Sequence, residues 1–186
     1  MDRVGTLGDR AAQIALRDVG KTADQARHLT HHYNHYWWVL RPGVDVEAVK
    51  ARGYPLDSEV AGPMDWCGMA ISNWIRQALD LPYWDWRSGW RRPLAGHPFG
   101  YFLGGADQIE EWAKLAGRWR PARLIDPIPA GAVATIDKGA ARPRHALMIV
   151  RDLGDGRVET VEGNLSNQVG RHIRRKNQLR GWALWW

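Results

Sequence analysis

The sequence predicts an α+β fold in which N-terminal helices pack on a C-terminal antiparallel β-sheet. Apolar residues recur at helical spacing in the first 116 residues and at the alternating spacing of β-strands beyond residue 131. Short turn sequences separate the strand-like runs, which is typical of consecutive strands that pair antiparallel. The 186 residues suit a single compact domain, which we divide into an N-terminal helical subdomain, residues 1–59, and a core, residues 60–186.

Five segments of the first half have helical character. The first ends at Gly20, and Thr22 and Gln25 have the spacing of a capping box for the second. In the last of these helices we expect Ile109, Trp112 and either Leu115 or Ala116 to face inward. A stretch rich in Pro, Gly, Trp and Arg, residues 81–105, is predicted to be a long ordered loop. The predicted helices are residues 9–19, 23–39, 44–51, 65–79 and 106–116.

The second half contains short runs with β-type alternation, separated by turns. Asp155 and Gly156 mark one of these turns, and residues 164–167 mark another. The basic run at residues 171–176 alternates like an edge strand, and we expect its side chains to be solvated. The predicted strands are residues 132–136, 145–151, 157–162, 168–174 and 182–186.

Composition limits the classes of function. The net charge of +6 attracts polyanions such as nucleic acid, an anionic membrane or an acidic cell-wall polymer. No apolar run approaches the roughly 20 residues of a membrane span, and the first residues lack the apolar segment of a secretory signal. The single cysteine excludes an intramolecular disulfide framework and a Cys-cluster zinc site. Because no phosphate-loop or dinucleotide motif is present either, we expect no cofactor.

That cysteine, Cys67, lies at the start of the predicted helix 65–79. A helix N-terminus supplies partial positive charge and free N–H groups, which favour a thiolate and could receive an oxyanion. The carboxylate of Asp65 opposes the thiolate unless it caps the helix. The alternative is that Cys67 is a small buried hydrophobic residue.

Three polar residues on neighbouring predicted strands could activate this thiol. His145 begins one strand, and the next strand ends with Glu162 and Asn164 on one face. If odd-numbered residues of the first strand lie opposite even-numbered residues of the second, His145 faces Glu162 or Asn164. A nucleophile, an imidazole and a group that orients the imidazole follow the logic of a catalytic triad. The alternative is a structural histidine at the edge of the sheet.

Three sequence blocks resemble the CHAP family of cysteine, histidine-dependent amidohydrolases and peptidases. Residues 65–70, Asp-Trp-Cys-Gly-Met-Ala, resemble the family's Trp-Cys helix start. Residues 128–133 resemble its Pro-Gly-Asp strand entry, with Ala132 in place of the Asp, and residues 144–150 and 160–166 resemble its His strand and Glu-Gly-Asn strand. The resemblance covers about residues 60–175. The chain departs from the pattern at Ala146, where Val is common, and in its long Arg- and Trp-rich segment, residues 81–105.

The resemblance implies a papain-like fold and hydrolysis of an amide bond through a thioester. It implies that Cys67 is the nucleophile, that His145 is the general base and then the general acid, and that Glu162 orients the imidazole, with Asn164 as a second polar partner. Most members cleave bacterial peptidoglycan, so we expect a peptidoglycan amidase or endopeptidase. The missing secretory signal favours synthesis in the cytoplasm and delivery to a target periplasm or cell wall, as an effector toxin or a phage lysin. A toxin would require an immunity protein, which would most simply bind around Cys67.

Tryptophan is overrepresented, with twelve residues against two phenylalanines. An indole ring offers a large apolar area and one N–H donor, so we expect Trp66, Trp86 and Trp90 to contact the substrate. The alternative is that these rings pack on the core while neighbouring arginines stay solvated.

Two other functions remain open from the sequence. A papain-like toxin could cleave a cytosolic protein, and a basic module could bind nucleic acid without using Cys67. The second alternative leaves the order of the His and Glu-Gly-Asn blocks unexplained. One face of the second predicted helix, His28, His31, His32 and His35, is interpreted as solvated; no cysteine or carboxylate nearby completes a metal site, so we assign no metal.

Overall fold

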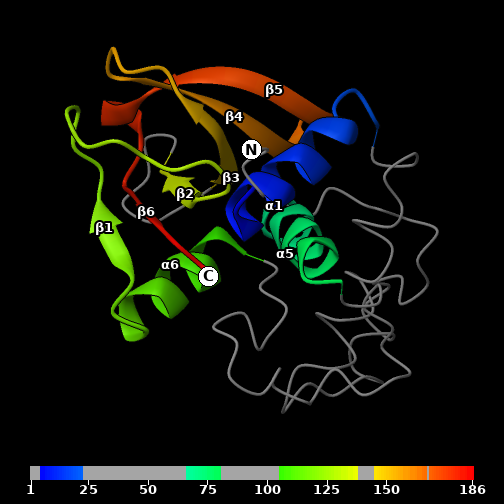
Figure 1. Ribbon diagram of the computed structural model, residues 1–186, viewed down its shortest axis with the longest axis horizontal. Helices are drawn as coiled ribbons and strands as arrows, with labels where there is room; N and C mark the ends of the chain where they lie inside the picture. Colours follow the sequence, from blue (N-terminus) through cyan, green and yellow to red (C-terminus); the bar gives the residue numbers. More distant parts are fainter. Residues whose placement is uncertain (1–4, 23–65, 81–104, 138–144, 167) are drawn as a thin grey trace, which may run out of the picture.

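A twisted antiparallel sheet with helices packed against it makes up the described part of the molecule (Figure 1). The computed structural model describes residues 5–22, 66–80, 105–137, 145–166 and 168–186, to which all structural statements refer. The helices are α1 (Leu7–Arg17), α5 (Cys67–Ala78), α6 (Ala106–Leu115) and the short 3-10 helix η2 (Lys176–Gln178). The strands are β1 (Trp119–Pro121), β2 (Val133–Ile136), β3 (His145–Asp152), β4 (Arg157–Leu165), β5 (Gln168–Arg175) and β6 (Gly181–Ala183).

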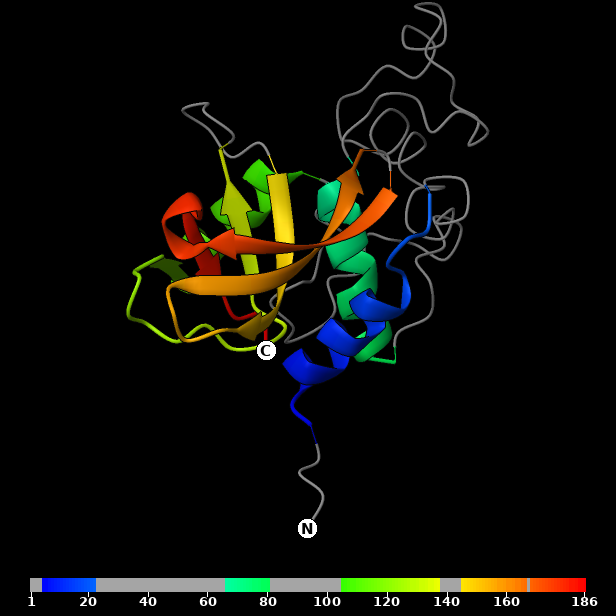
Figure 2. The ribbon, with the colours of Figure 1, turned by 90° about the horizontal axis from the view of Figure 1, so that it is seen from above.

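The strand order is β1-β6-β2-β3-β4-β5, and every neighbouring pair is antiparallel. Helices α1 and α5 lie side by side and pack against β3 and β4, while α6 lies near β1 and β2 (Figures 1 and 2). This is the predicted α+β architecture, with helices preceding an antiparallel sheet.

Alternation along β3 divides the core between the two faces of the sheet. Ala146 and Met148 join the cluster that includes the inner residues of α1 and α5. Leu147 and Ile149 join a second cluster on the other face, with Trp182 from β6. Helix α1 contributes to the same core as the sheet, although most of the predicted 1–59 subdomain lies outside the described residues.

The N-terminus of α1 is capped by a motif that sequence reasoning missed. Thr6 Oγ1 accepts from the Asp9 N–H at 3.1 Å, and Asp9 Oδ2 accepts from the Thr6 N–H at 2.8 Å. This capping box starts the helix at Leu7, two residues before the predicted start. At the other end, Gly20 has a φ of +87°, which suits glycine in the turn after the helix.

Other expectations about elements need correction. Neither Leu115, which is 83 % exposed, nor Ala116, which is also exposed, faces inward. Ala113, one helical turn after Ile109, lies in the core instead. The strand expected at residues 182–186 is Gly181–Ala183, and β1 was not predicted. The predicted helices 23–39 and 44–51, most of the loop 81–105 and the histidine face lie outside the described residues. Within the described ranges, none of the helices combines the length and apolar character that crossing a membrane requires.

Candidate active site

Cys67 is the first residue of α5, where the helix begins without a side-chain cap. The Ala70 N–H donates to the Trp66 carbonyl at 3.1 Å and closes the first turn. The N–H groups before Ala70 have no acceptor within the helix, so the partial positive charge of the helix terminus lies beside the sulfur. Cys67 is 2 % exposed and lies in the core that joins α5 to the sheet.

A glycine on β4 lets the first turn of α5 approach the sheet. A Cβ atom on Gly163 would lie 2.5 Å from the Ala70 Cβ and 2.9 Å from the Trp66 Cζ3. No real side chain tolerates contacts this short, so only glycine allows α5 to lie this close to β4. The Gly of the Glu-Gly-Asn block therefore sets how close the first turn of α5, which carries Cys67, lies to β4, the strand that carries Glu162.

The register between β3 and β4 meets the condition under which the sequence places His145 opposite Glu162 or Asn164. Met148 pairs with Val161, so odd-numbered residues of β3 lie opposite even-numbered residues of β4. His145 Nε2 lies 2.9 Å from Glu162 Oε2, which is one of the two contacts that the sequence predicted. Both side chains are buried, with 3 % exposure for His145 and none for Glu162.

The imidazole of His145 interacts with both Cys67 and Glu162. Burial lowers the pKa of His145, but side-chain hydrogen bonds with Cys67 and Glu162, together with their charges, raise it to about 9. Because Glu162 occupies Nε2, Nδ1 is the ring nitrogen that remains for the thiol. An imidazole that interacts with a cysteine on one ring nitrogen and with a carboxylate on the other can exchange a proton with the sulfur.

Glu162 is surrounded by donors on both oxygens. Thr160 Oγ1 donates to Oε1 at 2.7 Å, and Arg174 donates to Oε1 from Nε at 2.7 Å and to Oε2 from a terminal nitrogen at 2.6 Å. Burial raises the pKa of Glu162, but hydrogen bonds from Arg174, His145 and Thr160 hold it well below the ordinary range. The carboxylate is therefore ionised throughout the physiological pH range.

Sequence reasoning missed Arg174, which it placed in a solvated edge strand. The structure corrects this expectation for two basic residues of the run: Arg174 binds Glu162, and the buried Lys176 binds Asp152. Arg171 binds the buried Glu159, but its own side chain is 53 % exposed, as expected. The alternation of the strands indicates the contact of Arg174 in part. Glu162 pairs with Gly170 across the hairpin, so even-numbered residues of β4 and β5, including Glu162 and Arg174, lie on one face.

The remaining predicted site residues have different outcomes. Asn164 is half-buried near the end of β4 with a φ of +60°, a left-handed conformation that asparagine tolerates. Trp66 is 2 % exposed and packs in the core, so its ring supports the start of α5 instead of forming a surface for substrate. Trp86, Trp90 and Asp65 lie outside the described residues.

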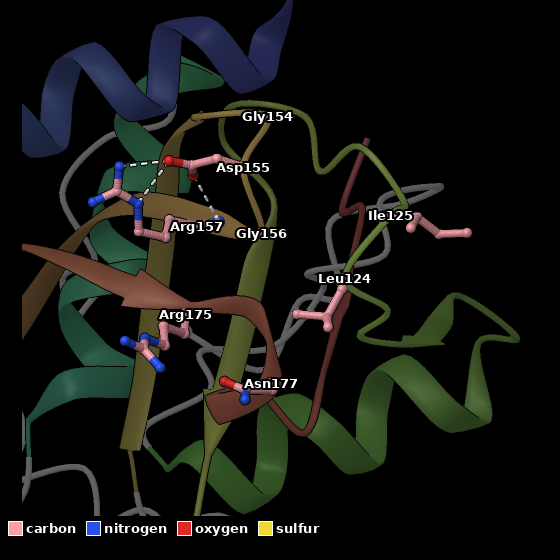
Figure 3. A pocket seen from close by; sticks show the side chains of 8 residues that line it. All are labelled: Leu124, Ile125, Gly154, Asp155, Gly156, Arg157, Arg175 and Asn177. Carbon is pink, nitrogen blue, oxygen red and sulfur yellow. Dashed lines mark hydrogen bonds and ion pairs between the residues drawn. The ribbon is translucent and has the colours of Figure 1, made fainter.

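A separate cavity of about 820 Å³ is lined by none of these residues (Figure 3). Leu124 and Ile125 border it with 55 % and 88 % of their surface exposed. On the opposite side Asp155 binds the guanidinium of Arg157, which leaves this pair without a role at the Cys67 site.

Comparisons with known proteins give no family for this chain. No family model matches it, and no curated protein matches it. A crystal structure of Ly7917 with the hydrolyzing product of MDP is similar, with a TM-score of 0.47 and 14 % identity over 95 % of this chain and 62 % of that one. A crystal structure of Ly7917 alone has a TM-score of 0.38 and 17 % identity over 62 % of this chain and 51 % of that one. The chain thus spans less than two thirds of the Ly7917 chains.

Proposed function

We propose that this protein is a cysteine hydrolase that cleaves amide bonds through a thioester intermediate. Cys67 is the nucleophile, His145 the general base and then acid, and Glu162 the group that orients the imidazole. One observation carries the proposal: a buried imidazole interacts with the only cysteine on one side and with a buried carboxylate 2.9 Å away on the other.

The first half of the reaction forms the thioester. His145 Nδ1 takes the proton of Cys67, and Sγ attacks the carbonyl carbon of the scissile amide. The first N–H groups of α5, which have no acceptor within the helix, are the proposed donors to the oxyanion that forms. The C–N bond then breaks as the imidazolium of His145 gives its proton to the leaving nitrogen, which departs as an amine.

The second half regenerates the enzyme. His145 removes a proton from a water molecule, whose oxygen attacks the thioester carbon. The C–S bond breaks, the product leaves as a carboxylic acid, and the sulfur recovers its proton from His145. Glu162 keeps its negative charge throughout and stabilises the imidazolium in both halves.

Peptidoglycan is the proposed substrate. The CHAP-like blocks around Cys67, His145 and Glu162 support this assignment, and the net charge of +6 favours association with an anionic wall. We propose further that the protein acts as an effector toxin or a phage lysin in a target periplasm or cell wall. A producer of the toxin would need an immunity protein.

Digestion of purified sacculi tests the proposal. We expect the wild-type protein to release muropeptides with new amine and carboxyl ends, which mass spectrometry assigns to one amide bond. Cys67→Ala should reduce this release at least about 10³-fold. Arg157→Ala, in a surface ion pair with Asp155, is the control and should retain full activity.

Two results would overturn parts of the proposal. Intact sacculi together with Cys67-dependent cleavage of a cytosolic protein would refute the substrate but keep the chemistry. Nucleic-acid binding that weakens steeply with salt and is unchanged in Cys67→Ala, without any hydrolysis, would refute the chemistry itself.

A further inference from the structure

We propose that Arg174 is a positioning residue of this site: its guanidinium holds both oxygens of Glu162 and thereby fixes the direction from which Glu162 accepts the hydrogen bond of His145. This inference rests on the proposed function of Cys67, His145 and Glu162. It assigns a role to a residue on β5, a strand that contains none of the three.

The contact has the geometry that only arginine provides. Nε and a terminal nitrogen of Arg174 donate to Oε1 and Oε2 of Glu162 at 2.7 and 2.6 Å, so two bonds of one planar fork fix the plane of the carboxylate. Oε2 also accepts from His145 Nε2 at 2.9 Å. Any rotation of the carboxylate that improved one contact would weaken the others.

Charge gives Arg174 a second effect, opposite to the first. Glu162 has no exposed surface, and an unpaired carboxylate in such a place is strongly destabilising. Arg174 compensates this charge but also reduces the attraction between Glu162 and the His145 imidazolium. The charged or titratable groups that face this carboxylate are His145 from β3 and Arg174 from β5, with Cys67 of α5 beyond the imidazole.

A cavity gives access to Arg174 from outside the Cys67 site. Its volume is about 400 Å³, and its lining includes Arg174, Asp137 and Ile136. Ile136 is also the strand partner of His145 across β2 and β3, while His145 does not line the cavity. The Arg174 side chain is 20 % exposed, in contrast to the fully buried Glu162 that it binds.

The same strand supplies a matched control. Arg171 binds the buried Glu159 from the opposite face of β5, and its side chain is 53 % exposed. In the described part of the chain the other ion-pair partner of Glu159 is Arg151, which does not belong to the proposed triad. Arg171→Ala therefore removes an arginine–glutamate pair of the same hairpin without touching Glu162.

The experiment compares Arg174→Lys, Arg174→Ala and Arg171→Ala by two readouts: kcat for the Cys67-dependent reaction, and the titration of His145 followed by NMR on ¹⁵N-histidine protein, with His145→Gln assigning the signal. Arg174→Lys keeps the charge but loses the fork, so we expect a kcat about 10- to 100-fold lower and an almost unchanged His145 pKa. Arg174→Ala loses both, so kcat falls similarly and the His145 pKa rises. Arg171→Ala should leave both readouts unchanged.

Chemical rescue adds an independent test. The cavity beside Arg174 should admit guanidinium at millimolar concentration, and we expect it to restore part of the activity of Arg174→Ala but none of that of Cys67→Ala. A folded Arg174→Lys with wild-type kcat would overturn the inference, and if Arg174→Ala does not fold, Arg174→Lys alone decides. A wild-type protein without Cys67-dependent hydrolysis would refute the proposed function instead. In that case an unchanged His145 titration in both Arg174 variants would refute the inference separately.

Discussion

Two buried glutamates of this molecule, Glu110 and Glu162, each accept hydrogen bonds from a threonine and an arginine but differ in their third donor. Glu110 of α6, 3 % exposed, accepts from the Thr135 hydroxyl at 2.9 Å, from Arg180 at 3.0 and 3.1 Å, and from Lys114 at 2.6 Å. Burial raises the pKa of Glu110, but hydrogen bonds from Arg180, Lys114 and Thr135 lower it to about 2. Glu162 likewise accepts from one threonine, one arginine and a third nitrogen.

The third nitrogen separates the two clusters. At Glu110 it is the amino group of Lys114, whose side chain is 53 % exposed and contacts no nucleophile among the described residues. At Glu162 it is the imidazole of His145, which can gain or lose a proton and which also interacts with Cys67. A buried carboxylate with arginine and threonine donors is therefore structural by itself. It becomes part of a proposed active site only where its third partner can transfer a proton to a nucleophile.

The strongest test of this comparison is the matched pair Glu162→Gln and Glu110→Gln. Glu162→Gln should lower kcat about 10²- to 10⁴-fold, because an amide stabilises the imidazolium poorly. Glu110→Gln should leave kcat unchanged and cost roughly 1–3 kcal/mol of unfolding free energy, since its partners Lys114 and Arg180 are partly solvated. Steady-state kinetics and urea unfolding provide both measurements. Equal losses of kcat in the two variants would remove the distinction.

His145 and Glu110 should lose their stabilising effects at opposite ends of the pH scale, while Glu162, whose pKa is lowered, loses its own at the acid end like Glu110. The pKa of His145 is raised to about 9 from 6.5, so its contribution is complete below pH 6.5 and is lost as the pH rises through 9. The pKa of Glu110 is lowered to about 2 from 4.5, so its contribution is complete above pH 4.5 and is lost as the pH falls through 2.

Urea unfolding of the wild-type protein, His145→Gln and Glu110→Gln between pH 2 and 10 measures the pH range over which each contribution is lost. The alkaline loss of unfolding free energy, at most about 3 kcal/mol, should be reduced in His145→Gln, and the acid loss should be reduced in Glu110→Gln. An alkaline loss of the same size in His145→Gln would show that another group titrates there.

The smallest expected effect concerns the two threonines. Thr160→Val and Thr135→Val each remove one hydrogen bond to a buried glutamate, at 2.7 and 2.9 Å, and each should cost about 1 kcal/mol of unfolding free energy. Only Thr160→Val should lower kcat, by a few-fold, because only its glutamate holds His145. A lower kcat in Thr135→Val would indicate that the Glu110 cluster also supports the reaction.

The alternation of apolar residues and the turn sequences were the most informative features of the sequence. They predicted the antiparallel sheet and, for one of the two possible parities of the β3–β4 register, a contact of His145 with Glu162 or Asn164; the structure has that parity and the contact with Glu162. Strand periodicity predicts which face of the sheet a side chain lies on. The side chains of His145 and Glu162 lie on one face of two neighbouring strands, so this prediction is enough to bring them into contact.

The sequence did not predict contacts that depend on the length of a side chain, or strands that form by pairing with a segment far away in the chain. Arg174 pairs with Val158 in the register, yet its long side chain extends along the face to Glu162, which strand pairing alone does not indicate. Strand β1 is three residues long, includes Pro121 and exists because it pairs with β6 at the end of the chain. A segment this short has no internal periodicity to read.

The position of Arg174 in the chain determines when the site is completed during synthesis. Cys67 emerges first, followed by His145 and Glu162, but the guanidinium that holds Glu162 arrives only with β5. A nascent chain that stops before β5 therefore carries all three proposed triad residues without the guanidinium that holds Glu162. Completion of the proposed site therefore requires the β4–β5 hairpin as well as the helix and the strand that supply Cys67 and His145.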